Sequence, residues 1–415
     1  MCSIRTGLDF YLKKFTFTVM KKYGLLFLLS LPLVGCADKD AEYIDPRGTD
    51  YAGSQSCIQC HKHTSESARM HAHFTATAPG TVDNILGNFT PGHNTFEYDQ
   101  NVKISIEKRG DSVFHVVYKN GKEQKAYPVG IVFGSKNAQT PVYWNNHNTF
   151  ELPLSYYKSV NNWGTSPGFS STQPYFDRKV VKDCYACHSS NSSGRLVTGQ
   201  SDKVNFMTED YEDAIDPKTI VFGIDCERCH GPAQKHVSFH LKYPDVKTAN
   251  FITKFSTLTN AQKIEACAIC HSGTKGVKIK STFSFKPGDK MSDFYLKKAY
   301  DSYDVHGNQY GMLTQSKCFS VSKNMTCTTC HDPHQDKRQA PADFAPVCTS
   351  CHETIAHTGG TLKTIKAKRW EHDCVECHMP KQPSQAIIFQ QYKNSEFSKY
   401  LLRSHRIAVY QTKAP

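Results

Sequence analysis

The chain has 415 residues, of which 39% are hydrophobic and 12% aromatic, and its formal net charge is +12. This length and aromatic content exclude a disordered tail or a mini-protein, because enough apolar side chains are present for a sizeable core. The 17 cysteines and 20 histidines are unusually many, and together they point to metal or cofactor chemistry.

The first apolar run, residues 25–33, is too short to cross a bilayer, because a spanning helix needs about 20 residues. Two lysines precede it and Leu33-Val34-Gly35-Cys36 ends it, an order that is typical of an export signal. The tetrapeptide resembles a bacterial lipoprotein box. We therefore expect residues 1–35 to be a signal segment, with Met20 as an alternative start, and Cys36 to carry a lipid anchor. The other interpretation is an uncleaved tail with a chance cysteine.

These features predict a location in the bacterial cell envelope, either periplasmic or facing the surface. The basic balance does not by itself indicate a nucleic-acid partner, because the chain has no run of Lys and Arg with interleaved aromatic residues. An exported, membrane-anchored protein also meets little nucleic acid. We therefore interpret the excess of basic residues as solvated surface.

A Cys-x-x-Cys-His motif begins at Cys57 and recurs six times along the chain. Two cysteines three residues apart lie on one face of a helical turn, where both thiols can reach the vinyl groups of one porphyrin while the next histidine binds its iron. The seven copies contain 14 of the 17 cysteines and are Cys57/Cys60/His61, Cys184/Cys187/His188, Cys226/Cys229/His230, Cys267/Cys270/His271, Cys327/Cys330/His331, Cys348/Cys351/His352 and Cys374/Cys377/His378.

Zinc and disulfides are the competing explanations of these motifs. A structural zinc site needs four ligands, so it gives no reason for one histidine after every cysteine pair. Disulfides suit an oxidising compartment but leave the histidines equally unexplained. The motifs therefore predict seven covalently bound haem c groups.

The long interval between the first two motifs carries patterns of β-strands. Apolar and polar residues alternate over 102–107, and a second β-rich stretch, 112–118, is closed by Asn120-Gly121, a strong hairpin signal. Further short apolar runs follow up to residue 157. We expect a small antiparallel β insert over residues 80–170 that covers one or two haem faces; a docking or substrate-channel role is the alternative.

The remaining motifs lie close together, and the segments between them favour short helices and loops. Thr259-Asn260 can cap a helix that runs into Cys267, and residues 395–403 set Phe397, Tyr400 and Leu401 on one helical stripe. So little polypeptide separates the motifs that the porphyrins must supply much of the buried apolar surface. We therefore expect the haem-free chain not to fold from Asp183 onward.

The predicted fold is a mainly α and irregular multihaem cytochrome c core with a small antiparallel β insert. Residues 36–79 form the first haem segment, 80–170 the insert and 171–415 the haem-dense domain. Thirteen histidines lie outside the motifs, more than seven irons need. Because only six methionines follow the signal segment, we expect mostly bis-histidine haems, which have low potentials.

Four longer runs resemble multihaem cytochromes of the cytochrome c-554 family: Tyr51–His61, Cys226–His236, Cys327–His334 and Cys374–Pro380. The match lies in patches around the motifs. The resemblance implies distal iron ligands, for which the candidates are His236, His334, His405, His357, His372, one of the pair His71 and His73, and, as a seventh, His93.

The leading functional hypothesis is an envelope electron carrier whose donor and acceptor are redox proteins or quinol-linked partners. The competing class is a multihaem oxidoreductase that acts on a small nitrogen or sulfur compound at one open haem, around which Tyr51, Tyr143, His147 and His306 could lie. The Cys-x-x-Cys-Lys motif that marks the catalytic haem of some nitrite reductases is absent. A structural haem scaffold or filament subunit is a third class.

Overall fold

The computed structural model describes residues 44–193, 214–273, 276–296, 303–335, 341–353 and 374–410. The predicted signal segment, the lipidation candidate Cys36 and the ligand candidates His357 and His372 lie outside these ranges. Within them, no helix is both long enough and apolar enough to cross a membrane.

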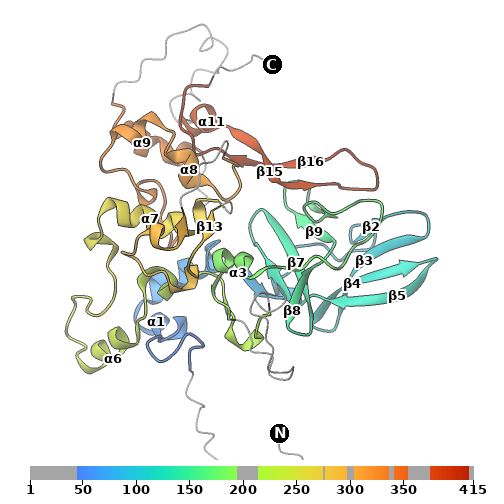
Figure 1. The fold of residues 1–415 in the computed structure, drawn as a ribbon, viewed down its shortest axis with the longest axis horizontal. Coiled ribbons are helices and arrows are strands. Elements are labelled where there is room, and N and C mark those ends of the chain that lie inside the picture. The colour runs from blue at the N-terminus through green and yellow to red at the C-terminus, as the bar shows by residue number, and fades with distance from the viewer. Residues whose placement is uncertain are drawn as a thin grey trace, which may run out of the picture. The chain divides into compact units, whose positions relative to one another are not determined.

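Two antiparallel sheets occupy the chain between residues 77 and 165 (Figure 1). The first has the order β1-β6-β7-β9-β10, with β8 beside β7, and the second has the order β2-β3-β4-β5. The strands of the first are β1 (Thr77–Pro79), β6 (Ile131–Phe133), β7 (Ala138–Asn145), β8 (Asn148–Glu151), β9 (Leu154–Tyr157) and β10 (Asn162–Thr165). Those of the second are β2 (Thr95–Glu97), β3 (Val102–Arg109), β4 (Ser112–Lys119) and β5 (Lys122–Pro128).

The hairpin predicted at Asn120-Gly121 is confirmed. It joins β4 to β5, and its two central residues have φ angles of 51° and 73°. Both positive values fit a two-residue turn whose twist matches the paired strands, which is why this dipeptide is favoured there. The alternating pattern on β3 is confirmed as well, because Ile104 and Ile106 are fully buried while Lys103 is exposed.

The two sheets enclose one apolar core. Ile104 and Ile106 of the four-stranded sheet and Leu154 and Trp163 of the six-stranded sheet belong to the same buried cluster. A second cluster contains Ile131 of β6 together with Tyr185, which lies within the second attachment motif. The strand region is therefore a sandwich with its own core that also packs against the haem-attachment segments.

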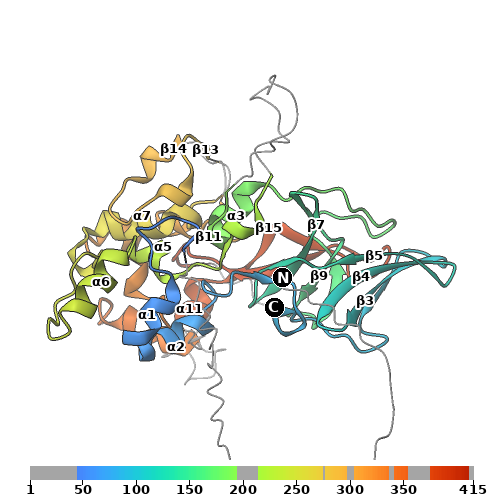
Figure 2. The same ribbon diagram turned by 90° about the horizontal axis from the view of Figure 1, so that it is seen from below.

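Short helices joined by loops lie beside the sandwich in both ribbon views (Figures 1 and 2). The α-helices are α1 (Ser54–Cys60), α2 (Lys62–Met70), α3 (Lys182–His188), α5 (Cys226–His230), α6 (Gln234–Lys242), α7 (Asn260–His271), α8 (Gln309–Leu313), α9 (Lys317–Val321), α10 (Ala345–Thr349) and α11 (Cys374–His378). The 3-10 helices are η1 (Val82–Asn84), η2 (Pro217–Thr219), η3 (Phe255–Thr257), η4 (Thr282–Ser284), η5 (Met291–Asp293), η6 (Cys327–Thr329) and η7 (Pro341–Phe344). The predicted cap of α7 is confirmed: Thr259 and Gln262 form a capping box at its start.

Three small antiparallel pairs of strands lie among these helices: β11 (Ser189–Asn191) with β12 (Val221–Phe222), β13 (Val277–Lys278) with β14 (Tyr295–Leu296), and β15 (Lys381–Phe389) with β16 (Ser398–Arg403). The last hairpin reaches the sandwich. The ring of Phe389 stacks on Tyr157 at 3.7 Å between centroids, and the backbone N–H of Thr165 donates to the carbonyl of Gln390 at 2.9 Å.

The prediction of a mainly α fold with a small β insert is therefore wrong. Strands build both sheets of the sandwich and recur in the haem-dense part of the chain. The helix predicted over residues 395–403 is also wrong, because this segment forms β16, where Tyr400 is buried and Leu401 exposed. The spacing of its apolar residues fits a helical stripe. The backbone N–H and C=O groups of this segment nevertheless form their hydrogen bonds with β15 and not within a helix.

Candidate haem-attachment sites

Each attachment site takes the name of its first cysteine. The motifs lie on single helical turns: α1, α3, α5, α7, η6, α10 and α11 each carry one of them in whole or in part. This placement brings both thiols of a pair to one side, as attachment to one porphyrin requires. All fourteen motif cysteines are free thiols, so no disulfide consumes them.

The possible metal ligands of the described ranges lie in pairs of imidazoles and not in larger groups. In them, no three side chains of His, Cys, Asp or Glu come together so that they could hold a metal ion. The histidines instead form pairs of imidazoles. Two imidazoles that bind one metal ion from opposite sides have ring centroids roughly 6 Å apart, given metal–nitrogen distances of about 2.0 Å.

Four motif histidines face a second histidine at this separation. Each pair joins segments that are distant in the sequence, so the tertiary fold brings the rings together. The ring centroids are 6.3 Å apart for His61 and His236, 5.9 Å for His230 and His334, 6.1 Å for His331 and His405, and 6.0 Å for His271 and His73. The residues present thus fit a haem iron with two axial imidazoles.

One further contact between histidines was not predicted. His306 lies close enough to the Cys184-site histidine, His188, to help depress its pKa. On sequence grounds His306 was only one of several residues that could lie around an open haem. No local signal distinguishes it, since it sits in an ordinary loop and joins His188 only through the tertiary fold.

The other ligand candidates have different outcomes. His71 lies next to His73, with ring centroids 4.7 Å apart, but it is His73 that faces a motif histidine. His93 is exposed on the loop before β2, and no contact between its ring and a motif imidazole occurs within the described ranges. For the Cys348 and Cys374 sites, His357 and His372 lie outside those ranges.

Three residues of the Cys348 and Cys374 sites lie at the surface of the described ranges. Cys351, His352 and Cys377 are all exposed. Among the residues that the structure describes, no second imidazole faces His352, in contrast to the four paired motif histidines. The described elements around these residues, η7, α10 and α11, pack against one another.

Exposure of these thiols is compatible with attachment, because a cysteine must be accessible to the porphyrin with which it forms a thioether. The described residues nevertheless do not complete the ligand set of either site. Haem binding through Cys351, His352 and Cys377 therefore stays a prediction that rests on the motif alone.

The Nδ1 atoms of several imidazoles contact acceptors. An Nδ1 that donates to an oxygen carries the proton, which leaves Nε2 free to bind a metal. The Nδ1–oxygen distances are 3.1 Å from His230 to the carbonyl of Thr253, 2.7 Å from His236 to that of Asn250, 2.9 Å from His378 to that of Ala408, 3.1 Å from His271 to the Gln309 side chain and 3.2 Å from His334 to Asp332.

Burial favours the neutral form of several of these imidazoles. It lowers the pKa of His73 to about 3, with a further contribution from His271, and it lowers the pKa values of His188 and His405 to about 4. The pKa of His306 is lowered for the same reason. Neutral imidazole is the form that binds metal, so these sites hold their ligands ready over the physiological pH range.

Neighbouring attachment sites touch through their cysteines. In each contact two thiols of different motifs lie close enough that one raises the pKa of the other: Cys57 and Cys226, Cys187 and Cys270, Cys267 and Cys327, and Cys348 and Cys374. The Cys226 site also meets the Cys184 site, because an Arg228 nitrogen lies 3.4 Å from the carbonyl oxygen of Ala186. The attachment sites therefore lie side by side, in an order that differs from their order in the chain.

The sandwich contributes to the Cys184 site. Phe133 of β6 packs edge-on against His188, with ring centroids 5.6 Å apart, and Tyr185 of α3 donates to Thr149 at 3.0 Å. Tyr185 is fully buried in the cluster that includes Ile131. The β insert was expected to cover one or two haem faces. These contacts place it directly against the Cys184 site.

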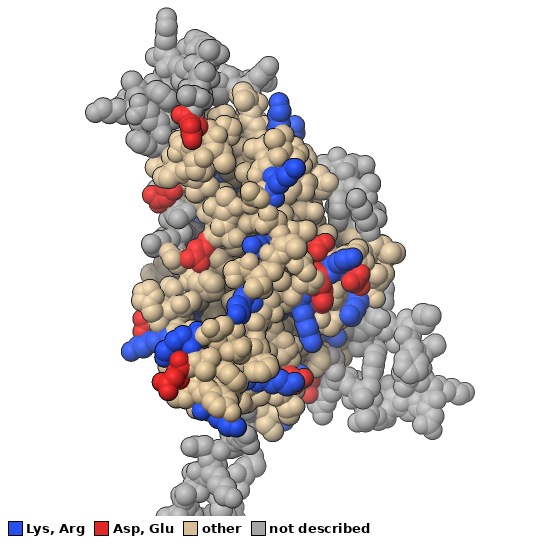
Figure 3. Space-filling model, turned by 90° about the vertical axis from the view of Figure 1, so that its left-hand side faces the viewer, with Lys and Arg blue, Asp and Glu red and all other residues tan. Residues whose placement is uncertain are grey.

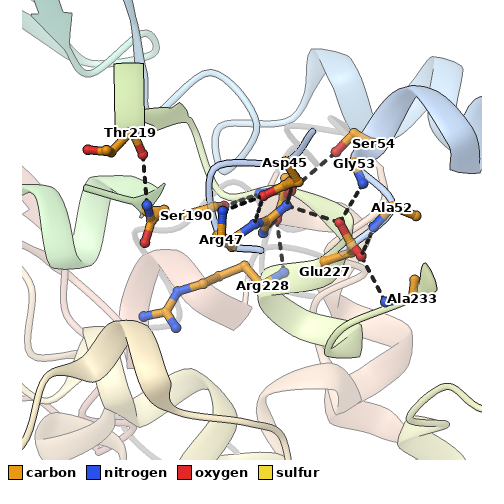
Figure 4. Close-up of polar contacts among 12 residues, drawn as sticks. Asp45, Arg47, Ala52, Gly53, Ser54, Ser190, Thr219, Glu227, Arg228 and Ala233 are labelled. Atoms are coloured by element: carbon orange, nitrogen blue, oxygen red, sulfur yellow. Dashed lines mark hydrogen bonds and ion pairs between the residues drawn. The ribbon is translucent and has the colours of Figure 1, made fainter. Parts of the chain in front are cut away.

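A buried ionic cluster joins the segment before α1 to the Cys226 motif (Figure 4). Arg47 contacts Asp45 at 2.9 Å, Asp225 at 2.7 Å and Glu227 at 3.0 Å, and all four side chains are at most 6% exposed. Glu227 also accepts from the backbone N–H groups of Ala52, Gly53 and Ala233. These contacts fix α1 against α5 and so bring the Cys57 and Cys226 sites together.

Comparisons with known proteins agree with this chemistry. Residues 320–357, which contain the Cys327 and Cys348 motifs, match the family described as "Doubled CXXCH motif". The chain is 25% identical over 216 residues to the multihaem cytochrome MtrA of Shewanella baltica (strain OS185), an alignment that covers 50% of this chain and 55% of the relative. A similar solved structure is the undecahaem cytochrome from the S-layer of Carboxydothermus ferrireducens, with 16% identity and a TM-score of 0.38 over 80% of this chain and 51% of that chain.

The chain thus spans about half the length of the proteins it matches. The motifs, their placement on helical turns, the matched family and this relative together identify the chain as a multihaem c-type cytochrome.

Proposed function

We propose that the protein is a heptahaem cytochrome that carries electrons along closely spaced, mostly bis-histidine haems. The observation that carries the proposal is the set of facing imidazoles. An iron with two imidazole ligands has no open position for a substrate, so such a site transfers electrons without binding a small molecule. Haem iron supplies the one-electron chemistry, while the chain supplies ligands, burial and spacing.

The contacts between cysteines, with the contact of Arg228 and Ala186, support an electron path through five of the seven sites. The Cys57 site adjoins the Cys226 site, the Cys184 site adjoins the Cys267 site, and the latter adjoins the Cys327 site. Porphyrins attached to touching helical turns lie close together. Electrons can then enter at one end of the array and leave at another, so the protein needs no mobile carrier between its own sites.

We also propose that the protein works in the bacterial cell envelope, held there by a lipid on Cys36, and that it belongs with the cytochrome c-554 family. Its partners are then redox proteins or quinol-linked enzymes. The S-layer origin of the undecahaem cytochrome is in keeping with such a location. On the face that carries α6, α7 and α9, positive and negative side chains are interspersed with uncharged surface, which does not suit a polyanion (Figure 3).

Electron paramagnetic resonance of the oxidised protein tests the proposal. We expect low-spin ferric signals at the sites with facing imidazoles, unchanged by nitrite, hydroxylamine or cyanide. A high-spin component that shifts when one of these compounds is added would contradict a pure carrier. It would favour the alternative, an oxidoreductase with one open haem.

A further inference from the structure

One short segment of the backbone contacts the imidazoles of two different haem sites. Residues 250–253, which we call the histidine strap, run between α6 and η3. The carbonyl of Asn250 accepts from Nδ1 of His236, the ring that faces the Cys57-site histidine, at 2.7 Å. The carbonyl of Thr253 accepts from Nδ1 of His230, the histidine of the Cys226 site, at 3.1 Å.

The strap is held at both ends by further hydrogen bonds. The backbone N–H of Asn250 donates to Nε2 of His240 at 3.5 Å, and the backbone N–H of Thr253 donates to the carbonyl of His230 at 3.2 Å. At the Thr253 end the contact is reciprocal, because His230 both accepts from and donates to the same residue. At the Asn250 end two histidines of α6, His236 and His240, bind the same backbone residue. Each end of the strap is therefore fixed by two hydrogen bonds.

The strap contains a strained residue. Phe251 has a φ of 56°, a conformation that bulky side chains rarely adopt, and its side chain is 60% exposed, so burial does not explain why this residue is tolerated there. Its ring contacts Phe239 of α6 with centroids 5.3 Å apart. A strained conformation persists where the surrounding contacts require it, and here those contacts are the hydrogen bonds to the two imidazoles.

We propose that the histidine strap sets the donor strength of one imidazole at each of two adjacent haem sites, and that the positive-φ backbone conformation at position 251 holds the strap in place. The inference rests on the proposed function, because both sites must carry iron. A hydrogen bond from Nδ1 to a carbonyl fixes the tautomer and makes the imidazole a stronger donor. A stronger donor favours ferric iron and so lowers the potential of the site. Because the Cys57 and Cys226 sites are in contact, the strap lowers the potentials of two neighbouring haem sites together.

Two substitutions at one position separate the backbone conformation from the aromatic ring. Phe251→Gly and Phe251→Val both remove the ring, but glycine adopts a positive φ without strain while β-branched valine cannot. Redox titration of the haem-loaded variants, followed by optical and paramagnetic resonance spectra, is the measurement. We expect Phe251→Val to shift two midpoint potentials upward and to change two low-spin signals, and Phe251→Gly to keep the potentials of the unaltered protein.

If Phe251→Val retains its full haem content and has the same potentials and signals as Phe251→Gly, the strap has no such role. If that variant does not load with haem, the unaltered holoprotein decides. In nuclear magnetic resonance of histidine labelled with nitrogen-15, the Nδ1 protons of His230 and His236 should be protected from exchange with solvent, and exchange at the rate of an exposed imidazole overturns the inference. An unaltered protein that lacks haem would reject the proposed function itself, so the two failures are distinguishable.

Discussion

At the scale of single residues, the choice of distal ligand is the feature that local sequence cannot supply. His306 lies near His188, and His73 faces His271, only because the tertiary fold brings separate segments together. The resemblance to a known family pointed to His236, His334 and His405, and the structure places each of them opposite a motif histidine. It gave no signal for His306, and it suggested His93, which lies exposed on the sandwich.

A pair of alanine substitutions tests this assignment. His306→Ala should convert one site from low-spin to high-spin, because the iron at the Cys184 site loses its second imidazole. His93→Ala is the matched control and should leave every signal unchanged. Paramagnetic resonance of the oxidised variants is the readout. A low-spin spectrum in His306→Ala, or a new high-spin signal in His93→Ala, would show that the assignment is wrong.

His115 offers a prediction on pH dependence. Its side chain is fully buried beside Trp163 in the sandwich, neither ring nitrogen has a hydrogen-bond partner, and burial lowers its pKa to about 3. As the pH falls below about 6.5, the unfolded chain gains a proton at this residue that the folded chain does not, so the folded state loses stability down to about pH 3.

His115→Leu removes both the unpaired nitrogens and the titration. We expect it to stabilise the sandwich by about 1 kcal/mol at pH 7, because a buried polar group without a partner is costly, and by roughly 2 kcal/mol more at pH 5. Denaturant unfolding followed by circular dichroism at the two pH values measures the difference. An equal gain at both values would show that His115 does not titrate in this way.

At the scale of elements, local signals succeeded where the partner is near in the sequence. The Asn120-Gly121 turn and the Thr259 capping box were predicted because each depends on residues a few positions apart. Strand β16 was mistaken for a helix because its partner β15 lies beyond a loop and its apolar spacing fits either structure. Strands β11 and β12 pair across a longer stretch of chain and left no local pattern.

The buried ionic cluster before α1 is the element whose loss should cost most stability. Arg47→Met leaves Asp45, Asp225 and Glu227 buried without their cation, and breaking such a pair costs about 3–5 kcal/mol. Burial already raises the pKa of Glu227, which shows how poorly this environment solvates charge. Thermal unfolding of the holoprotein should show a much lower midpoint.

Arg109→Met is the matched control for this substitution. Arg109 also contacts two carboxylates, Glu107 and Glu123, but its side chain is 38% exposed. Solvent-exposed pairs contribute less than about 1 kcal/mol, so we expect little change. Similar losses in the two variants would mean that the cluster at Arg47 does not anchor α1 to α5.

At the scale of the whole molecule, apolar side chains are unevenly distributed. The large cluster of buried residues lies in the sandwich, whereas the cluster around Ile269, Phe285 and Phe294 in the haem-dense part has only these three buried members. We therefore expect the helical part to depend on porphyrins for its core. The sandwich has a large core made of its own side chains. The prediction of a small insert underestimated this core.

A haem-free preparation, made without export, should separate the two parts. We expect its circular dichroism to keep the strand signal and lose most of the helical signal. Limited proteolysis should leave a protected fragment that includes residues 77–165. A spectrum close to that of the holoprotein would contradict the dependence of the helical part on haem.

Covalent haem at all seven motifs is the claim on which the electron-carrier function depends most. The intact mass of the exported holoprotein tests this directly, because each thioether-bound haem adds its own mass to the polypeptide. We predict a mass increased by seven haem groups beyond the processed chain and any attached lipid. A mass equal to that of the lipidated polypeptide alone would contradict the claim.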